Sequence, residues 1–249
     1  MTAIILGLWF TARQVTQDPS PGDVLSQVNQ TYTNLDSYMD WGTVTFSYRS
    51  ATGERRGDVR LFNTSFQRPN KLKYEFIEPA SESAKEKRWV TWTASRGNYA
   101  TWTNWSPHEV NRTALQKSLF RTWGMSEACG LPLKLLAPWA LSGPRPTGIY
   151  NSVLQHEDVN GHPCWRIDGV CEDGAHAAVW VDTHTSLVLR YRHAVDAKLD
   201  GKPTNEIYTV ELHPTGNPHL GTSDLRFNVP ESGSSHHSGH KKKRRRRRG

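Results

Sequence analysis

The sequence has 249 residues, of which 36% are hydrophobic, and a formal net charge of +7 at pH 7. Eight of its 31 lysine and arginine residues lie in residues 241–248, which leaves 23 basic side chains against 24 acidic ones in the rest of the chain. The body is therefore close to neutral, which argues against a nucleic-acid-binding domain, because such a domain carries its positive charge on the folded surface. No apolar run approaches the roughly 18 to 20 residues that a membrane-spanning helix needs.

The two ends of the chain differ from the body in composition. Residues 4–10 form a short apolar run that resembles the hydrophobic part of a secretory signal, although the preceding basic residues are missing. We therefore interpret residues 1–17 as a truncated signal segment, with an ordinary apolar terminus as the alternative. Residues 233–249 are rich in histidine and then in lysine and arginine, which predicts disorder. Such a tail could attract nucleic acid, an anionic membrane surface or an acidic partner, or it could be a solubilising or accidental extension. The residues expected to touch the anionic surface are Lys241, Lys242, Lys243, Arg244 and Arg245.

The body begins with a helix followed by a strand. Residues 18–23 contain aspartate and serine side chains that can cap a helix, together with two prolines suited to its first turn. Apolar residues then recur at spacings of three and four, which predicts an amphipathic helix facing a sheet. These residues are Val24, Leu25, Val28, Tyr32 and Leu35. Residues 41–48 follow as the first predicted strand, because apolar side chains alternate there with threonine and serine.

The stretch from Gly57 to Trp105 predicts an antiparallel meander. Within it, Leu72, Tyr74 and Phe76 alternate with charged residues, and a period of two places alternate side chains on opposite faces of a strand. The neighbouring segments are equally short, are rich in threonine, valine and aromatic residues, and are separated by glycine, proline, asparagine and serine. Several such strands predict a curved sheet with one polar and one apolar face.

Two helical segments are predicted next. Ser106 and Pro107 favour a helix start, and the apolar residues that follow as far as Trp123 predict a helix with a broad apolar face. Residues 131–141 are the least polar part of the protein, and their two prolines exclude one long helix. We therefore expect short helical pieces that lie across the apolar face of the sheet.

The second half returns to strands. They are predicted at residues 149–156, 164–167, 177–182, 187–191, 207–212 and 225–230, with turn signals at 160–161 and 183–185. Cys164 and Cys171 would be about 23 Å apart on one continuous strand and unable to pair, whereas a turn at residues 168–169 would bring them together. The sequence leaves both arrangements open.

Three short motifs resemble the outer-membrane lipoprotein carrier (LolA-like) superfamily. Residues 68–72, Arg-Pro-Asn-Lys-Leu, are similar to its R-P-N-L-F pattern, and residues 95–102 look like its S-D-G-K-x-x-W turn and strand, with Arg96 in place of aspartate. Residues 227–232 resemble its closing F-x-x-P-P strand with the second proline missing. The hairpin at residues 179–190 also looks like an uncharacterised periplasmic branch. The resemblance covers about residues 22–232.

The resemblance implies one α+β domain over residues 18–232, an incomplete antiparallel β-barrel whose helices cover a concave apolar side. It also implies a monomeric, exported carrier, with a cavity for the acyl chains of a lipid or lipoprotein. By this match Arg68 would be a latch that bonds the lid and keeps it closed, for which a planar guanidinium is well suited. The residues expected to line the cavity are Phe46, Leu72, Tyr74, Phe76, Trp92, Trp102, Leu133, Leu136 and Trp139.

A different interpretation of the same aromatic residues is a permanently filled core. The protein would then be a structural or sensory envelope domain that recognises a protein partner through its surface. An enzyme is not expected, because no nucleophile stands in motif spacing with a base, and no glycine-rich phosphate loop or cofactor motif is present. Two histidines and two cysteines lie within residues 162–176, but their spacing matches no standard zinc pattern, so no metal site is predicted.

Overall fold

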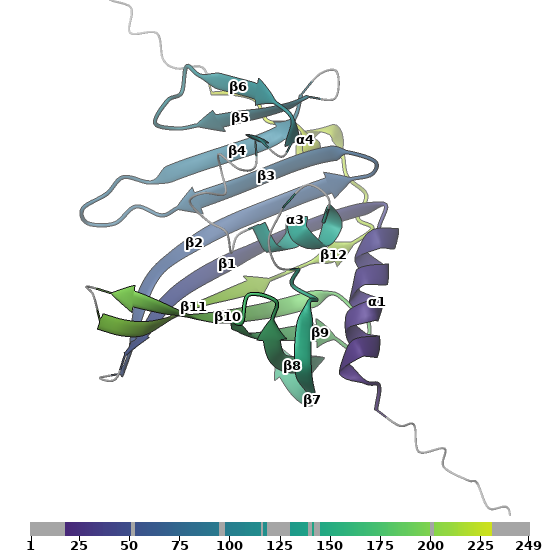
Figure 1. Cartoon of the computed structure of the whole chain (residues 1–249). Helices are drawn as coiled ribbons and strands as arrows, with labels where there is room; N and C mark the ends of the chain where they lie inside the picture. The colour runs from purple at the N-terminus through teal and green to yellow at the C-terminus, as the bar shows by residue number, and fades with distance from the viewer. Residues whose placement is uncertain are drawn as a thin grey trace, which may run out of the picture.

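Figure 1 shows the protein as a computed structural model, which describes residues 18–50, 53–94, 98–115, 117–118, 130–138, 141, 145–199 and 202–230. The strands are β1 (Ser37–Ser50), β2 (Gly53–Gln67), β3 (Lys71–Glu78), β4 (Lys87–Thr93), β5 (Tyr99–Thr103), β6 (Val110–Thr113), β7 (Ile149–Val159), β8 (His162–Cys171), β9 (His176–Asp182), β10 (Val188–Leu199), β11 (Lys202–Leu212) and β12 (Thr215–Gly216). The helices are α1 (Pro21–Asn34), α3 (Leu131–Leu136) and α4 (Thr222–Leu225).

The strands form one antiparallel sheet in the order β6-β5-β4-β3-β2-β1-β11-β10-β9-β8-β7, with β12 paired to β1. Its two edges are β6 and β7, so the sheet stays open over the described residues. Register shifts at Thr45/Ser47, Val188/Arg190 and Tyr150/Val153 mark β-bulges, which bend and twist the strands that carry them. The result is the α+β class with an open, curved sheet, as the sequence predicts.

Helix α1 begins where the capping residues predict. The Asp23 amide donates to Ser20 Oγ at 3.2 Å, and the Ser20 amide donates to Asp23 Oδ2 at 3.2 Å, which satisfies two helix-end donors at once. The residues of its buried face are Val24, Leu25, Val28 and Tyr32. They share one core with α3 and with one face of the sheet, and Figure 1 shows α1 beside the strand ends and α3 in front of the middle of the sheet.

Two predicted elements differ in the structure. The helix predicted from Ser106 is wrong in its first part, because Val110–Thr113 pairs with β5 as the edge strand β6. The predicted strand at residues 225–230 is replaced by α4 and an irregular segment. The irregular segment crosses the strands because the Phe227 ring packs against the rings of Trp92 and Trp102, with centroid distances of 5.1 and 5.2 Å. Among the described residues, we find no helix that is both long and apolar enough to cross a membrane.

Candidate functional site

The candidate site is the apolar face, defined here as the core-facing side chains of β2 and β3. Its members are Phe62, Phe66, Leu72, Tyr74 and Phe76. The register places Phe62 opposite Phe76 and Phe66 opposite Leu72, so these side chains point to the same side of the sheet. None of the five is more than 5% exposed. The alternation in β3 therefore places the three predicted β3 residues together, but inside the core.

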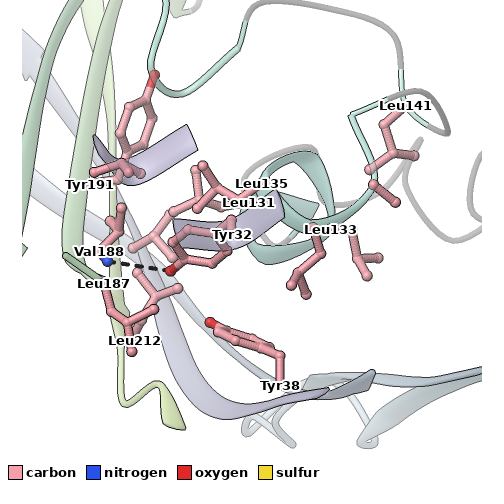
Figure 2. Packing of buried hydrophobic residues seen from close by; sticks show 14 of the residues in the cluster. Tyr32, Tyr38, Leu131, Leu133, Leu135, Leu141, Leu187, Val188, Tyr191 and Leu212 are labelled. Atoms are coloured by element: carbon pink, nitrogen blue, oxygen red, sulfur yellow. Dashed lines mark hydrogen bonds between the residues drawn. The ribbon is translucent and has the colours of Figure 1, made fainter. Parts of the chain in front are cut away.

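Helix α3 contributes apolar side chains to this core. The residues that it buries are Leu131, Pro132, Leu133, Leu135 and Leu136. Figure 2 shows leucines of α3 gathered near Tyr32 of α1 and Tyr38 of β1, and all of these residues belong to one buried cluster. The expected lining residues Leu133 and Leu136 thus lie in the same cluster as the apolar face, at 3% and 2% exposure.

The apolar face ends at a charged boundary. Phe46 is partly buried at this end, and the Arg60 guanidinium lies 4.6 Å from the centre of its ring. An amino group of Arg60 in turn lies 3.5 Å from a carboxylate oxygen of Glu78. Phe46 therefore lies where the apolar core meets solvent-facing charge, and it is farther from complete burial than Phe76.

Two other predicted lining residues, Trp92 and Trp102, do not join the apolar face. Trp92 lies opposite Lys73 and Trp102 lies opposite Val90, so the register places both tryptophans on the other side of the sheet. There they pack against Phe227. Trp139 lies outside the described residues, as do residues 1–17 and the basic tail from Lys241 to Arg245.

Arg68 fastens the end of α1 to the sheet. Its Nε donates to the Leu35 carbonyl at 2.8 Å, and its terminal amino group donates to the Tyr32 carbonyl at 2.9 Å. Its backbone amide also donates to the Asp36 carbonyl at 2.8 Å. The last carbonyls of a helix lack partners within the helix, and the planar guanidinium group of Arg68 donates to two of them at once. These contacts hold α1, whereas the predicted lid was residues 131–141.

Polar side chains that sequence reasoning missed lie between α1 and the sheet. Tyr32 Oη accepts a hydrogen bond from the Val188 amide at 3.3 Å, the dashed line in Figure 2, and Tyr38 Oη donates to Asp40 Oδ2 at 2.8 Å. The two tyrosine rings lie 5.6 Å apart. Asp40 is 3% exposed, and this burial raises the pKa of its carboxyl to about 7. The sequence gives no signal for this group, because the neighbours of Asp40 in the chain, Met39 and Trp41, are the more apolar residues.

The structure also decides the arrangement of two cysteines. Cys164 and Cys171 are both free and buried, and β8 continues through Gly169 without a turn. The sulfur atoms therefore cannot pair. The histidines near them are not gathered around one point either: His162 lies 3.3 Å from Asp182, while His176 opposes Val170 across β8 and β9.

No family model matches the sequence, and no curated protein matches it. Among solved structures, a domain named for outer membrane lipoprotein sorting from Vibrio parahaemolyticus is 11% identical, with a TM-score of 0.32 over 81% of this chain and 94% of that chain. LprF from Mycobacterium bovis is 9% identical, with a TM-score of 0.42 over 84% and 95% of the two chains. MucB in its complex with MucA from Pseudomonas aeruginosa is 13% identical, with a TM-score of 0.41 over 84% and 61%. All three likenesses are at low sequence identity.

Proposed function

We propose that the protein binds an acyl chain of a lipid or lipoprotein on the apolar face, without catalysis and outside the cytoplasm. The observation that carries the proposal is that α3, a short helix, joins this core through apolar side chains. Helix α3 is six residues long and contributes leucine side chains to the core over this face. An isolated helix of this length is unstable in water, so α3 depends on burial to keep its place.

An acyl chain can take the place of these leucines at little cost. Apolar burial is non-directional and contributes about 25 cal/mol per Å² whether the buried group is a leucine or a methylene chain. A ligand that displaces α3 therefore recovers much of the free energy that α3 gives up. The protein described here is then the closed state, and ligand entry requires α3 to leave the apolar face.

In this proposal Arg68 acts as a latch, but it holds helix α1 and not the segment of residues 131–141. Its two bonds to the carbonyls of Tyr32 and Leu35 keep the end of α1 against the sheet. When α3 moves, α1 stays in place as a fixed wall of the site. Trp139, three residues beyond α3, would leave with it.

The test is native mass spectrometry of the full chain, purified without detergent and then mixed with palmitate. We expect a palmitate adduct, and we expect Leu133→Ala to raise the affinity because it weakens the competing helix. Phe76→Ala should lower the affinity because it removes part of the binding surface. Palmitate is far longer than the cavity left by one leucine, so a gain in Leu133→Ala cannot come from that cavity alone. A chain that never binds palmitate, with all three forms folded, would refute the proposal.

A protein partner is the second candidate function, and exposed apolar side chains favour it. Met39, Trp41 and Leu61 lie on the opposite face of β1 and β2 and are 40%, 55% and 37% exposed. The Trp41 ring stacks on His213 at a centroid distance of 3.6 Å, which holds it flat on the surface. If palmitate does not bind, loss of a cross-linked envelope partner in Trp41→Ala would support this function instead.

The basic tail is proposed to bring the carrier to anionic membranes. Lys241, Lys242, Lys243, Arg244 and Arg245 belong to a run of eight bases, and each base near an anionic surface contributes about 1 kcal/mol. Deletion of residues 236–249 should abolish binding to vesicles that contain phosphatidylserine and should leave palmitate binding unchanged. Equal vesicle binding by the full and shortened chains would remove this part of the proposal.

A further inference from the structure

A thiol, a carboxylate and an imidazole meet at the end of β8, where Cys171 belongs to the same buried cluster as the apolar face. Cys171 is the last residue of β8, Asp173 lies in the turn to β9, and His193 lies in β10. One ligand atom from each of the three residues lies within 4.8 Å of the other two. The closest measured approach is 3.5 Å, between His193 Nε2 and Asp173 Oδ2.

The turn between β8 and β9 fixes the first two of these groups. The Cys171 amide donates to the Ala175 carbonyl at 2.8 Å, and the Gly174 amide donates back to the Cys171 carbonyl at 3.0 Å. Gly174 has a φ of 82°, a left-handed conformation that glycine adopts without strain. Asp173 Oδ1 accepts a hydrogen bond from the Ala175 amide at 3.0 Å, which aims Oδ2 at His193. The carboxylate is thus oriented before any ligand arrives.

The sulfur and the imidazole are buried, whereas the carboxylate is open to solvent. Cys171 and His193 are 3% and 8% exposed, whereas the Asp173 side chain is 40% exposed. The Tyr208 ring stacks on His193 at 4.8 Å, and Tyr191 Oη lies 3.7 Å from the Cys171 sulfur. Such outer contacts orient metal ligands, and an ion would enter past the exposed carboxylate.

We propose that Cys171, Asp173 and His193 bind one zinc-like divalent transition-metal ion, with a water molecule in the fourth position. Tetrahedral coordination with zinc bond lengths places ligand atoms about 3.3 to 3.6 Å apart, so the nitrogen and oxygen already fit and the sulfur needs to approach them by about 1.5 Å at most. A mixed sulfur, nitrogen and oxygen set favours zinc over magnesium or calcium, which prefer oxygen alone. The thiol proton leaves to solvent, and thiolate plus carboxylate balance the double positive charge.

Zinc binds cysteine as the thiolate, so metal binding at this site should release the proton of the Cys171 thiol. A simple ion pair between His193 and Asp173 would need no sulfur and would release no proton from Cys171. This difference separates a metal site from an ordinary salt bridge.

The experiment is titration of the reduced, chelator-treated full chain with Co²⁺, followed by absorption in the near ultraviolet and visible range. We expect a thiolate-to-cobalt charge-transfer band with the intense visible bands of a tetrahedral site, and we expect Zn²⁺ to displace the cobalt. Histidines of the tail can also bind cobalt, but they cannot give a sulfur band. The charge-transfer band therefore reports on cysteine alone.

Matched variants assign the band to its residues. Cys171→Ser should abolish it, whereas Cys164→Ser, which alters the other buried cysteine of β8, and Cys129→Ser should leave it unchanged. Asp173→Asn changes an exposed turn residue and should fold normally, so a tenfold or greater loss of cobalt affinity in it supports the site even if Cys171→Ser unfolds. A missing charge-transfer band at saturating cobalt, or full affinity in Asp173→Asn, would overturn the proposal.

Discussion

Helices α1 and α3 pack into the same core but are held there by different interactions. Helix α1 is capped at one end by Ser20, and it is bonded to the sheet through Arg68 and through Tyr32. The side chains that α3 buries in the core are apolar, four leucines and a proline. Hydrogen bonds fix direction and distance, whereas apolar contacts can be exchanged for other apolar contacts. The comparison favours α3 over α1 as the helix that the proposed ligand would displace. Four predictions test this contrast.

The largest expected effect comes from truncating the apolar contacts of α3. Leu133→Ala should lower the free energy of unfolding by about 2–5 kcal/mol, because Leu133 is 3% exposed and its removal leaves a cavity. Urea unfolding followed by tryptophan fluorescence measures this loss. A loss below about 1 kcal/mol would mean that α3 is not packed against the sheet in solution, and the contrast with α1 would disappear.

The second effect comes from the buried carboxyl beneath α1. The pKa of Asp40 is about 7 in the folded protein against an ordinary value of 3.8. Between these values the folded state holds more protons than the unfolded state, so the free energy of unfolding falls as pH rises from about 4 to about 7 and is level above that. The fall is on the order of 4 kcal/mol at most.

Asp40→Asn tests the assignment, because an amide of the same shape does not titrate in this range. Its unfolding free energy should lose this pH dependence and should exceed that of the natural protein at pH 8. Asp58→Asn alters an exposed aspartate of β2 and should keep the slope of the natural protein. A slope that survives in Asp40→Asn would assign the titration to another group.

The third effect comes from releasing the end of α1. Arg68→Met removes both side-chain bonds to the carbonyls of Tyr32 and Leu35 and should cost about 2–3 kcal/mol. Amide hydrogen exchange should rise most in the last turn of α1 and least in α3. Lys87→Met removes a surface ion pair with Glu78, whose side chains are 47% and 22% exposed, and should cost about 1 kcal/mol or less. Equal exchange in α1 and α3 would contradict the contrast between the helices.

The smallest effect comes from a single hydroxyl of α1. Tyr32→Phe removes the acceptor for the buried Val188 amide and should cost about 1–2 kcal/mol. Tyr150→Phe is its control, because Tyr150 is 53% exposed and its bond to Glu172 lies at the surface. If the two substitutions change the urea midpoint equally, Tyr32 does not anchor α1.

Local patterns made much of the fold predictable. The alternation in β3, the three-and-four spacing in α1 and the Asn160–Gly161 turn all act within a few residues, and all appear in the structure. The helix predicted from Ser106 to Trp123 fails at Val110–Thr113, because pairing with β5 decides the conformation there and apolar spacing does not carry that information. Strand pairing is a property of two segments, and one segment alone does not specify it.

The candidate site was harder to predict for the same reason. Trp92 and Trp102 alternate with polar residues as Tyr74 does, but the face that they occupy depends on the register between β3, β4 and β5. A shift of one residue would have moved both tryptophans to the apolar face. Asp40 has an unexceptional sequence context, and its raised pKa follows only from burial that the folded chain imposes. Sequence reasoning also missed the meeting of Cys171 and His193, which requires two successive hairpins.

The pairing of β1 with β11 has a consequence for the order of assembly. From β1 to β6, and again from β7 to β11, every neighbour in the sheet is also the next strand in the chain. The two halves join along one seam, where residues such as Thr45 and Thr209 meet from opposite ends of the protein. Strands that are far apart in the sequence pair slowly. During synthesis the edge of β1 therefore stays unpaired until β11 has left the ribosome. A chain halted before Lys202 should therefore self-associate through β1, and sedimentation of such a fragment as a stable monomer would disprove it.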